Sequence, residues 1–312
     1  MPLYCGIGGV KHKISGLYTG VGGVKTELTE MWTAQGGVKK LIYRSKIDIT
    51  VSTSPSPGIS YADGLTGISP DIINEIANSI SNNSQIDKTT AVLYVDFENE
   101  HRKLRCDNGA PVQIIIYFDG GNYGFDIIGF NHDPLSDSTA YGDQTVTGKA
   151  GITFQLHDVL GDRAFDSNFS NQMGWEKSQM RTVIMPDLKR LFQTDWQSII
   201  KNVNKISAAK GGSQSTGTIT SSDDLFLLAE KEIFDQYSTG NSPESEARSV
   251  SRYAYYANGN STQKARDGYN RIWWTRSPSN GDSYSFCTIN ASGQTSTSFS
   301  DYNRGISFAF CV

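Results

Sequence analysis

Histidines next to carboxylates are the residues of this sequence best suited to metal or acid–base chemistry, and they are few. The chain has 4 histidines, and two of them are followed directly by an acid, in Asn131-His132-Asp133 and in His157-Asp158. Imidazole and carboxylate ligands suit zinc, so a site built from both pairs is one alternative. Neither pair has the i,i+4 spacing of a helical metal motif. We interpret them as loop histidines with capping aspartates and predict no metal site.

Nucleophiles in an activating context are also missing. The sequence contains no H-E-x-x-H, no G-x-S-x-G, no P-loop and no G-x-G-x-x-G before a helix. Its four cysteines, Cys5, Cys106, Cys287 and Cys311, are widely spaced, and none belongs to a C-x-x-C pair. We interpret them as buried free thiols, although Cys287 and Cys311 fall in apparent strands and could be neighbours. The sequence therefore predicts no catalytic residue and no cofactor.

The C-terminal segment has a composition suited to binding. After Lys264 the chain contains neither lysine nor glutamate, and most residues between Ser277 and Arg304 are Ser, Thr, Asn, Asp, Tyr or Arg. Antibody paratopes use the same chemistry, with Tyr and Arg for rigid contact area and Ser, Asn and Gly for adaptable hydrogen bonds. The alternative is an ordinary Ser/Thr-rich β surface with turns.

An internal repeat occupies residues 1–45. Three units, YCGIGGVKHKISGL, YTGVGGVKTELTEM and WTAQGGVKKLIYRS, carry an aromatic residue and Gly-Gly-Val-Lys at the same phase. Paired glycines permit positive φ, so we expect each unit to turn tightly at Gly-Gly between two short extended arms. One unit cannot bury its aromatic residue and valine alone, which predicts stacking on neighbours or on another chain. A flexible Gly-rich leader is the alternative.

Hydrophobic periodicity predicts the elements that follow. Residues 46–90 form a spacer with a half-buried strand at Lys46–Ser52 and an amphipathic helix at Pro70–Ser81, where Ser69 caps and Pro70 starts the helix. Residues 91–312 form the main domain. Strands are expected at Ala91–Val95, Val112–Phe118, Tyr123–Phe130 and Leu225–Leu228.

Two more helices and a terminal strand complete the prediction. A helix over Gln179–Phe192 must kink or restart at Pro186. A second helix places Trp196, Ile199, Ile200 and Val203 on one face. In the terminal strand Ile306–Val312, alternation predicts that Ile306, Phe308, Phe310 and Val312 are buried on one side.

Composition and charge exclude several classes of protein. The 312 residues carry a net charge of −4, only 19% are charged, and 11% are aromatic. This balance argues against a coiled coil and a basic nucleic-acid binder, so we predict no nucleic-acid partner. No long apolar run occurs, which predicts no membrane insertion. The first residues also lack the basic and apolar regions of a signal peptide.

The repeat resembles the N-terminal leaders of tail and baseplate-associated proteins in phages of Gram-positive hosts. The resemblance covers about 45 residues and rests on the tandem pattern of an aromatic residue followed by Gly-Gly-Val-Lys. In such proteins the leader precedes a variable receptor-binding region. The resemblance implies tail or baseplate partners, a homotrimer as in tail fibres, and a location in the virion after synthesis in the host cytoplasm.

A second resemblance covers roughly Ala91–Val312. Its marks are IIGFNHD from Ile127, GWEKSQMR from Gly174, DLFLL from Asp224, RIWWTRSP from Arg271 and RGISFAFCV from Arg304. Together they resemble a domain family of uncharacterised function found in phages and gut bacteria, whose clearest mark is W-W-x-R-S-P. Its C-terminal half is similar to the C-type-lectin fold of ligand-binding proteins diversified by retroelements.

This resemblance implies an α+β fold with a C-type-lectin-like C-terminal domain after the Gly-rich β-repeat. It makes Trp273, Trp274, Arg276 and Pro278 buried scaffold. Retroelement diversification turns Asn codons into Asp, Tyr, Ser, Thr, Gly, Ala or Arg but never Lys or Glu, which fits the C-terminal composition. The family's usual ending, Gly-Val-Arg-Pro-Ala, is replaced here by Gly305–Ala309. The residues expected to contact the receptor are Tyr269, Asn270, Ser279, Asn280, Asp282, Ser283, Tyr284, Asn290, Ser300, Asp301, Tyr302, Asn303 and Arg304.

The sequence thus predicts a phage tail adhesin, not an enzyme, that binds a glycan or protein receptor on the host surface. A bacterial surface or secreted adhesin with the same lectin-like domain is the main alternative. An enzyme is the third, since formylglycine-generating enzymes share a distant version of the fold. Those enzymes need reactive cysteines, and neither Cys287 nor Cys311 has a nearby activating His or Lys in the sequence.

Overall fold

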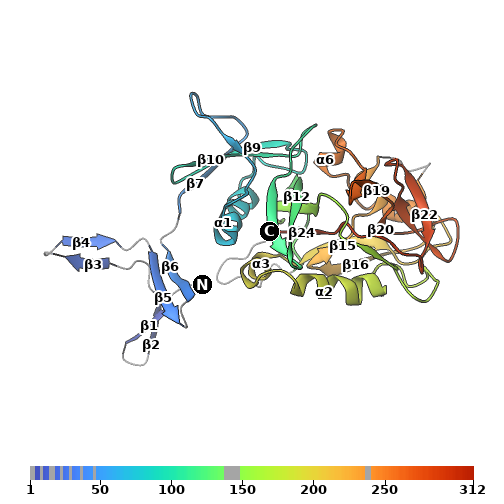
Figure 1. Cartoon of the computed structure of the whole chain (residues 1–312), viewed down its shortest axis with the longest axis horizontal. Coiled ribbons are helices and arrows are strands. Elements are labelled where there is room, and N and C mark those ends of the chain that lie inside the picture. The colour runs from blue at the N-terminus through green and yellow to red at the C-terminus, as the bar shows by residue number, and fades with distance from the viewer. Residues whose placement is uncertain are drawn as a thin grey trace. The chain divides into compact units, whose positions relative to one another are not determined.

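A computed structural model of the whole chain describes residues 47–136, 148–235 and 240–312, together with the backbone of six strands before them (Figure 1). The chain divides into two compact units, Met1–Asp48 and Ile49–Val312. Residues 49–90, expected to be a spacer, belong to the larger unit. Within the described residues, no helix has the length and apolar character needed to cross a bilayer.

The smaller unit consists of three antiparallel hairpins, each a separate two-stranded sheet. The pairs are β1 (Tyr4–Ile7) with β2 (Val10–Lys13), β3 (Tyr18–Val21) with β4 (Val24–Glu27), and β5 (Glu30–Gln35) with β6 (Val38–Arg44). In each hairpin the last paired residues flank a Gly-Gly dipeptide. The predicted stacking of aromatic and valine side chains lies outside the described residues.

The larger unit begins with a four-stranded sheet and a helix. The strands β7 (Ile49–Ser52), β8 (Ala62–Asp63), β9 (Val92–Phe97) and β10 (Glu100–Arg105) lie in the order β7-β9-β10-β8. Helix α1 spans Pro70–Ser81, as its sequence predicts, and buries Ile73, Ile76 and Ile80. The predicted strand from Lys46 begins only at Ile49.

A five-stranded antiparallel sheet forms the centre of the unit. It contains β11 (Ile114–Phe118), β12 (Gly121–Phe130), β13 (Ile152–Leu156), β24 (Ala309–Cys311) and β17 (Leu225–Phe226), in that order. Helix α1 lies so close that a Cβ at Gly151 would be 2.0 Å from the carbonyl oxygen of Ala77. Only glycine fits this approach of helix and sheet.

The C-terminal strand differs from its prediction. In the sheet β24 lies between β13 and β17, and every residue from Ile306 to Val312 is buried, so neither face of this segment is exposed. The expected one-sided burial is therefore wrong. The strand predicted for Leu225–Leu228 is also shorter, since β17 ends at Phe226.

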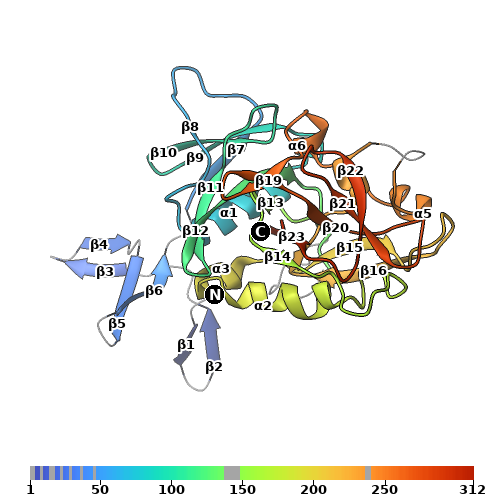
Figure 2. The same cartoon turned by 45° about the vertical axis from the view of Figure 1, so that its right-hand side comes forward.

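A second five-stranded sheet carries the C-terminal segment (Figure 2). Its order is β14 (Asp162–Arg163), β23 (Arg304–Gly305), β20 (Trp273–Pro278), β21 (Ser285–Ile289) and β22 (Thr295–Phe299). Two hairpins accompany it, β15 (Val203–Ala208) with β16 (Thr218–Asp223) and β18 (Lys264–Arg266) with β19 (Tyr269–Arg271). All residues of β20 are buried, including Trp273, Trp274 and Pro278.

The predicted helices near Pro186 and Trp196 form with changed bounds. A π-helical turn at Met180–Ile184 passes into α2 (Met185–Arg190), with Pro186 in its first turn, where a proline is tolerated. The next helix, α3 (Thr194–Ile199), ends before Ile200, whose backbone is extended. The helix expected to reach Val203 is thus too long, because the Lys201 N–H donates to the Cys311 carbonyl and draws the chain into the central sheet.

Three short helices, α4 (Glu230–Ile233), α5 (Glu244–Ala247) and α6 (Ala254–Ala257), complete the unit. Antiparallel sheets and helices are thus mixed in the larger unit. The fold class is α+β.

Candidate binding surface and the scaffold beneath it

A buried pair of opposite charges supports the second sheet from inside. The Arg276 guanidinium binds the Glu232 carboxylate through both terminal nitrogens, at 2.6 and 2.9 Å. It also donates to the carbonyl oxygens of Ile206 at 2.8 Å and Leu227 at 3.0 Å. Arg276 has no exposed surface. Its expected burial as part of the scaffold is confirmed.

Lys205 extends this pair into a network. Its ammonium lies 2.6 Å from an Asp133 oxygen and 2.9 Å from a Glu232 oxygen, and it also contacts the Tyr253 hydroxyl. Burial by itself raises the pKa of Glu232, but the charges of Arg276 and Lys205 outweigh it and hold this pKa at about 2. The carboxylates therefore stay ionised and paired, as buried charges must be.

Of the two histidine–acid pairs, only His132-Asp133 belongs to this interior network. Asp133 is not a capping residue. Its carboxylate accepts hydrogen bonds from the Lys205 ammonium and from the hydroxyls of Tyr253 and Thr153 inside the core. His132 stacks on Tyr253 at 3.8 Å between ring centroids. His157 contacts Asp126 rather than its neighbour Asp158. Across the part of the chain that the structure describes, no three metal-ligating side chains gather at one place.

The described cysteines are unreactive in their setting. Cys106, Cys287 and Cys311 are buried and unpaired, which confirms free thiols at these three positions, whereas the side chain of Cys5 is not described. Cys287 belongs to β21 and Cys311 to β24, which are strands of different sheets. Burial raises the pKa of Cys106 to about 12 and those of the other two well above the usual value. Such thiols do not supply a thiolate at neutral pH.

The predicted receptor-contacting residues differ widely in exposure. Tyr269, Asn270, Tyr284, Asp301, Tyr302 and Asn303 are exposed, and Asn280, Asp282, Ser283, Asn290 and Arg304 are half-buried. Ser279 and Ser300 are buried, at 2% and 0% exposure, so they do not face a ligand. The backbone carbonyl of each serine joins two loops inside the domain. The Ser279 carbonyl accepts the Gly212 N–H, and the Ser300 carbonyl accepts the N–H of Phe165.

Some of the half-buried residues hold their own loops in shape. One Asp282 oxygen accepts the backbone N–H groups of Tyr284 and Ser285, at 2.8 and 2.6 Å. The Asn290 side-chain oxygen does the same for Ser292 and Gln294. Side chains engaged in this way shape the surface rather than offer free hydrogen-bonding groups.

The structure gathers four half-exposed rings into one aromatic patch, consisting of Phe169, Tyr284, Phe299 and Tyr302. Phe169 stacks on Tyr284 at 5.0 Å and meets Phe299 at 5.1 Å. Phe299 in turn contacts Tyr302 at 5.3 Å. The Arg304 guanidinium lies over the Tyr302 ring at 5.4 Å. The patch thus joins Tyr284, Tyr302 and Arg304 from the predicted set with two phenylalanines that the prediction missed.

Phe299 was within reach of sequence reasoning, because it shares the face of a strand with the polar residues Thr295 and Thr297. Phe169 gave no signal, since it lies in a loop far upstream. Among the ring contacts of the described residues, none connects Tyr269 to the patch. Tyr269 lies instead on the β18–β19 hairpin, with the Arg271 guanidinium over its ring at 5.9 Å.

Asn171 fixes the loop that carries Phe169. This residue is fully buried, and its side-chain amide donates to the carbonyls of Asp282 at 2.8 Å and Ser285 at 2.7 Å. Its backbone N–H donates to Ser283. Phe169 itself has a φ of 48°, a conformation uncommon for a bulky residue. The aromatic patch is therefore held in place before any ligand arrives.

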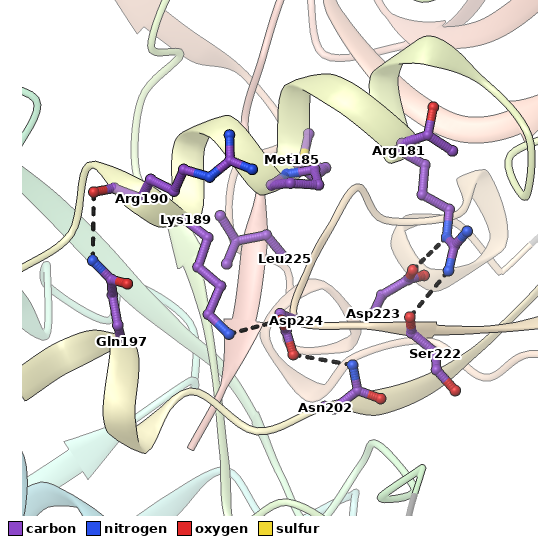
Figure 3. Close-up of a pocket in the computed structure, with 12 residues that line it drawn as sticks. Arg181, Met185, Lys189, Arg190, Gln197, Asn202, Ser222, Asp223, Asp224 and Leu225 are labelled. Atoms are coloured by element: carbon purple, nitrogen blue, oxygen red, sulfur yellow. Dashed lines mark hydrogen bonds and ion pairs between the residues drawn. The ribbon is translucent and has the colours of Figure 1, made fainter. Parts of the chain in front are cut away.

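A pocket of about 440 Å³ lies elsewhere, between α2 and the end of β16 (Figure 3). Four of its five charged side chains pair with one another, and the fifth, Arg190, pairs with Asp187. Arg181 binds Asp223 at 2.5 Å, and Lys189 binds Asp224 at 2.7 Å, as the dashed lines of Figure 3 show. Asn202 also donates to Asp224. This pocket offers a ligand few free groups, so we place the candidate site at the aromatic patch.

Comparison with known proteins gives one match. The family model described as "Domain of unknown function (DUF6273)" matches residues 151–312, just over half of the 312 residues, and the chain belongs to this family. The matched region contains the Arg276–Glu232 pair and the whole aromatic patch. No curated protein and no solved structure matches the chain.

Proposed function

We propose that this protein is a phage tail adhesin that binds a ligand on the host-cell surface through its C-terminal surface. The observation that carries the proposal is the aromatic patch, whose four rings are 40–47% exposed on a scaffold in which the buried Arg276, Glu232, Lys205 and Asp133 pair with one another. The largest contiguous apolar patches of single chains are often functional sites. Asp301 and Asn303 stand exposed beside the aromatic patch.

A C-type-lectin-like domain is part of the proposal. Three features support it: the buried Trp273-Trp274 pair, the buried Arg276, and a C-terminal strand paired inside the central sheet. The resemblance of the sequence to retroelement-diversified proteins adds to them. Sequencing several isolates tests diversification, because substitutions confined to the exposed positions from Tyr269 to Arg304 are expected, and evenly spread substitutions would contradict it.

The N-terminal hairpins are proposed to attach the chain to a tail or baseplate, and trimerisation would add avidity to a weak single site. The repetition of three hairpins supports attachment, because such units gain stability by packing on neighbours. Fusing residues 1–45 to an unrelated protein is expected to bring it into tails. Absence of the fusion from purified tails would remove this part of the proposal.

Binding to cells tests the adhesin function directly. Fluorescently labelled full chain is expected to bind some members of a panel of Gram-positive bacteria, as measured by flow cytometry. Tyr302→Ala, which removes a ring of the patch, is expected to weaken binding. A chain that binds no member of the panel, or a variant that binds as well as the wild type, would count against the proposal.

A further inference from the structure

The aromatic patch points to one chemical class of ligand. We propose that it binds a neutral saccharide, whose ring stacks on the faces of Phe169, Tyr284, Phe299 and Tyr302; this inference rests on the adhesin function proposed above. One face of a pyranose ring presents C–H groups and is apolar, while its rim carries hydroxyls. The π face of an aromatic ring carries partial negative charge and attracts such C–H groups.

The size of the patch favours a saccharide over a protein receptor. Its rings are 42%, 47%, 40% and 47% exposed. If a free aromatic side chain offers 150–250 Å², the four together expose roughly 350 Å². A stable protein interface needs about 800 Å² per partner. One or two sugar rings match the smaller area, and multiple copies of the chain would add the missing affinity.

Polar groups at the edge of the patch suit sugar hydroxyls. The Tyr284 and Tyr302 hydroxyls and the side chains of Asp301 and Asn303 make no hydrogen bond to any described residue, and all four residues are exposed. A hydroxyl both donates and accepts, so it can pair with a carboxylate, an amide or a phenol. Asp301 and Arg304 carry opposite charges next to the rings. This balance favours a neutral ligand over a strongly anionic one.

Preorganisation strengthens the case. Each contact with a sugar contributes little binding free energy. If the side chains and loops of the site had to become ordered on binding, the cost of ordering would cancel much of that free energy. Here the buried Asn171 amide fixes the Phe169 loop to the Asp282–Ser285 segment. Behind the patch, Phe165 stacks on Phe286 at 3.6 Å and contacts Trp274 at 5.4 Å. The rings therefore stand on a rigid base.

An array of immobilised bacterial cell-wall polysaccharides and neutral or acidic oligosaccharides tests the ligand class with the full chain. We expect binding to one or more neutral saccharides, weakened about tenfold by Phe169→Ala and by Tyr302→Ala. Tyr117→Ala is the matched control, because Tyr117 is 50% exposed on β11, outside the patch. Unchanged thermal unfolding shows that each variant is folded. Tyr284→Phe keeps the ring and is expected to bind more tightly than Tyr284→Ala.

Treated cells separate this inference from the adhesin function. Periodate cleaves the vicinal diols of sugars, whereas proteinase removes surface proteins. Loss of binding after periodate but not after proteinase supports a saccharide. Loss after proteinase alone, with a silent array, overturns the saccharide and leaves the adhesin. Array binding without binding to any cell supports the saccharide and contradicts the adhesin. Preference for acidic over neutral array members, or patch variants that bind like wild type, overturns the inference.

Discussion

Two polar regions of this protein use similar residue types in opposite ways. Inside, Arg276, Glu232, Lys205 and Asp133 satisfy one another at 2.6–2.9 Å with almost no exposure. Outside, Asp301 and Asn303 stand exposed beside the aromatic patch without a side-chain partner among the described residues. Charged side chains that pair with one another in the interior stabilise the fold, whereas exposed polar side chains without a partner are available to bind a ligand. The difference predicts that substitutions in the two regions separate stability from binding.

The largest effect is expected from Arg276→Met. This change leaves the buried Glu232 with the Lys205 ammonium and the Ala229 N–H, and it removes a donor from the carbonyl oxygens of Ile206 and Leu227. Breaking a buried pair in this way costs about 3–5 kcal/mol of unfolding free energy. Denaturant unfolding measures it. Arg190→Met is the control, because Arg190 pairs with Asp187 on the surface, where such pairs contribute under about 1 kcal/mol. Equal losses of unfolding free energy in the two variants would show that the buried network contributes no more to stability than a surface ion pair does.

Glu246 gives the next largest effect, and it depends on pH. Burial raises its pKa to about 7, against the charge of Arg276. A carboxyl group whose folded pKa exceeds its unfolded value of 4.5 stabilises the fold fully below pH 4.5, and this stabilisation is lost as pH rises toward 7. Relative to wild type, Glu246→Gln is therefore expected to be more stable at pH 8 than at pH 5, by up to about 3 kcal/mol.

Urea unfolding at both pH values measures this difference. Glu244→Gln on the same helix is the control, since Glu244 lies at the surface with Arg248. A difference between Glu246→Gln and wild type that does not change with pH would mean that Glu246 titrates normally. Glu232 acts in the opposite direction. Its pKa of about 2 means that its contribution is present above pH 4.5 and is lost as pH falls toward 2.

A smaller effect distinguishes two exposed tyrosines. The sequence placed both Tyr269 and Tyr302 at the receptor surface, but the ring contacts of the described residues join only Tyr302 to the patch. Tyr302→Ala is expected to weaken cell binding about tenfold, whereas Tyr269→Ala changes it less than about twofold. Flow-cytometry titrations compare them. A larger loss from Tyr269→Ala would move the binding surface to the β18–β19 hairpin.

The smallest effect compares two aspartates close in sequence. Asp282 accepts two backbone N–H groups, so Asp282→Ala is expected to lower the unfolding free energy by about 1 kcal/mol. Asp301 is exposed at the patch, so Asp301→Ala is expected to weaken binding with unchanged stability. Thermal unfolding and binding assays on both variants check this. The reverse pattern would show that Asp301 holds the loop and Asp282 meets the ligand.

The sequence was sufficient to predict those elements whose structure depends on residues close together in the chain. Pro70, Asp71 and the isoleucines at helical spacing predicted α1 with its observed bounds. Pro186 predicted an irregular helix, although not that a π turn would precede it. The burial of Trp273 and Trp274 followed from the resemblance and from their large apolar area, whereas the burial of Arg276 followed from the resemblance alone.

The features that could not be predicted depend on contacts between residues far apart in the chain. Ile306–Val312 alternates like a half-buried strand, yet all of its residues are buried, because β24 is an inner strand of the central sheet between β13 and β17, which are far apart in sequence. Ser279 and Ser300 resemble surface serines in the sequence, but in the structure both are buried and their backbone carbonyls bind neighbouring loops. Phe169 lies more than one hundred residues before its stacking partner Tyr284, so no local pattern could assign it to the site.

The central claim is that the aromatic patch binds a host-surface ligand on a scaffold that does not depend on the patch for stability. The most direct measurement is the affinity of the full chain for bacterial cells, compared between wild type and Phe169→Ala/Tyr302→Ala with thermal unfolding recorded in parallel. We predict unfolding temperatures within a few degrees and binding reduced at least tenfold. A double variant that unfolds like wild type and binds cells equally well would contradict the claim.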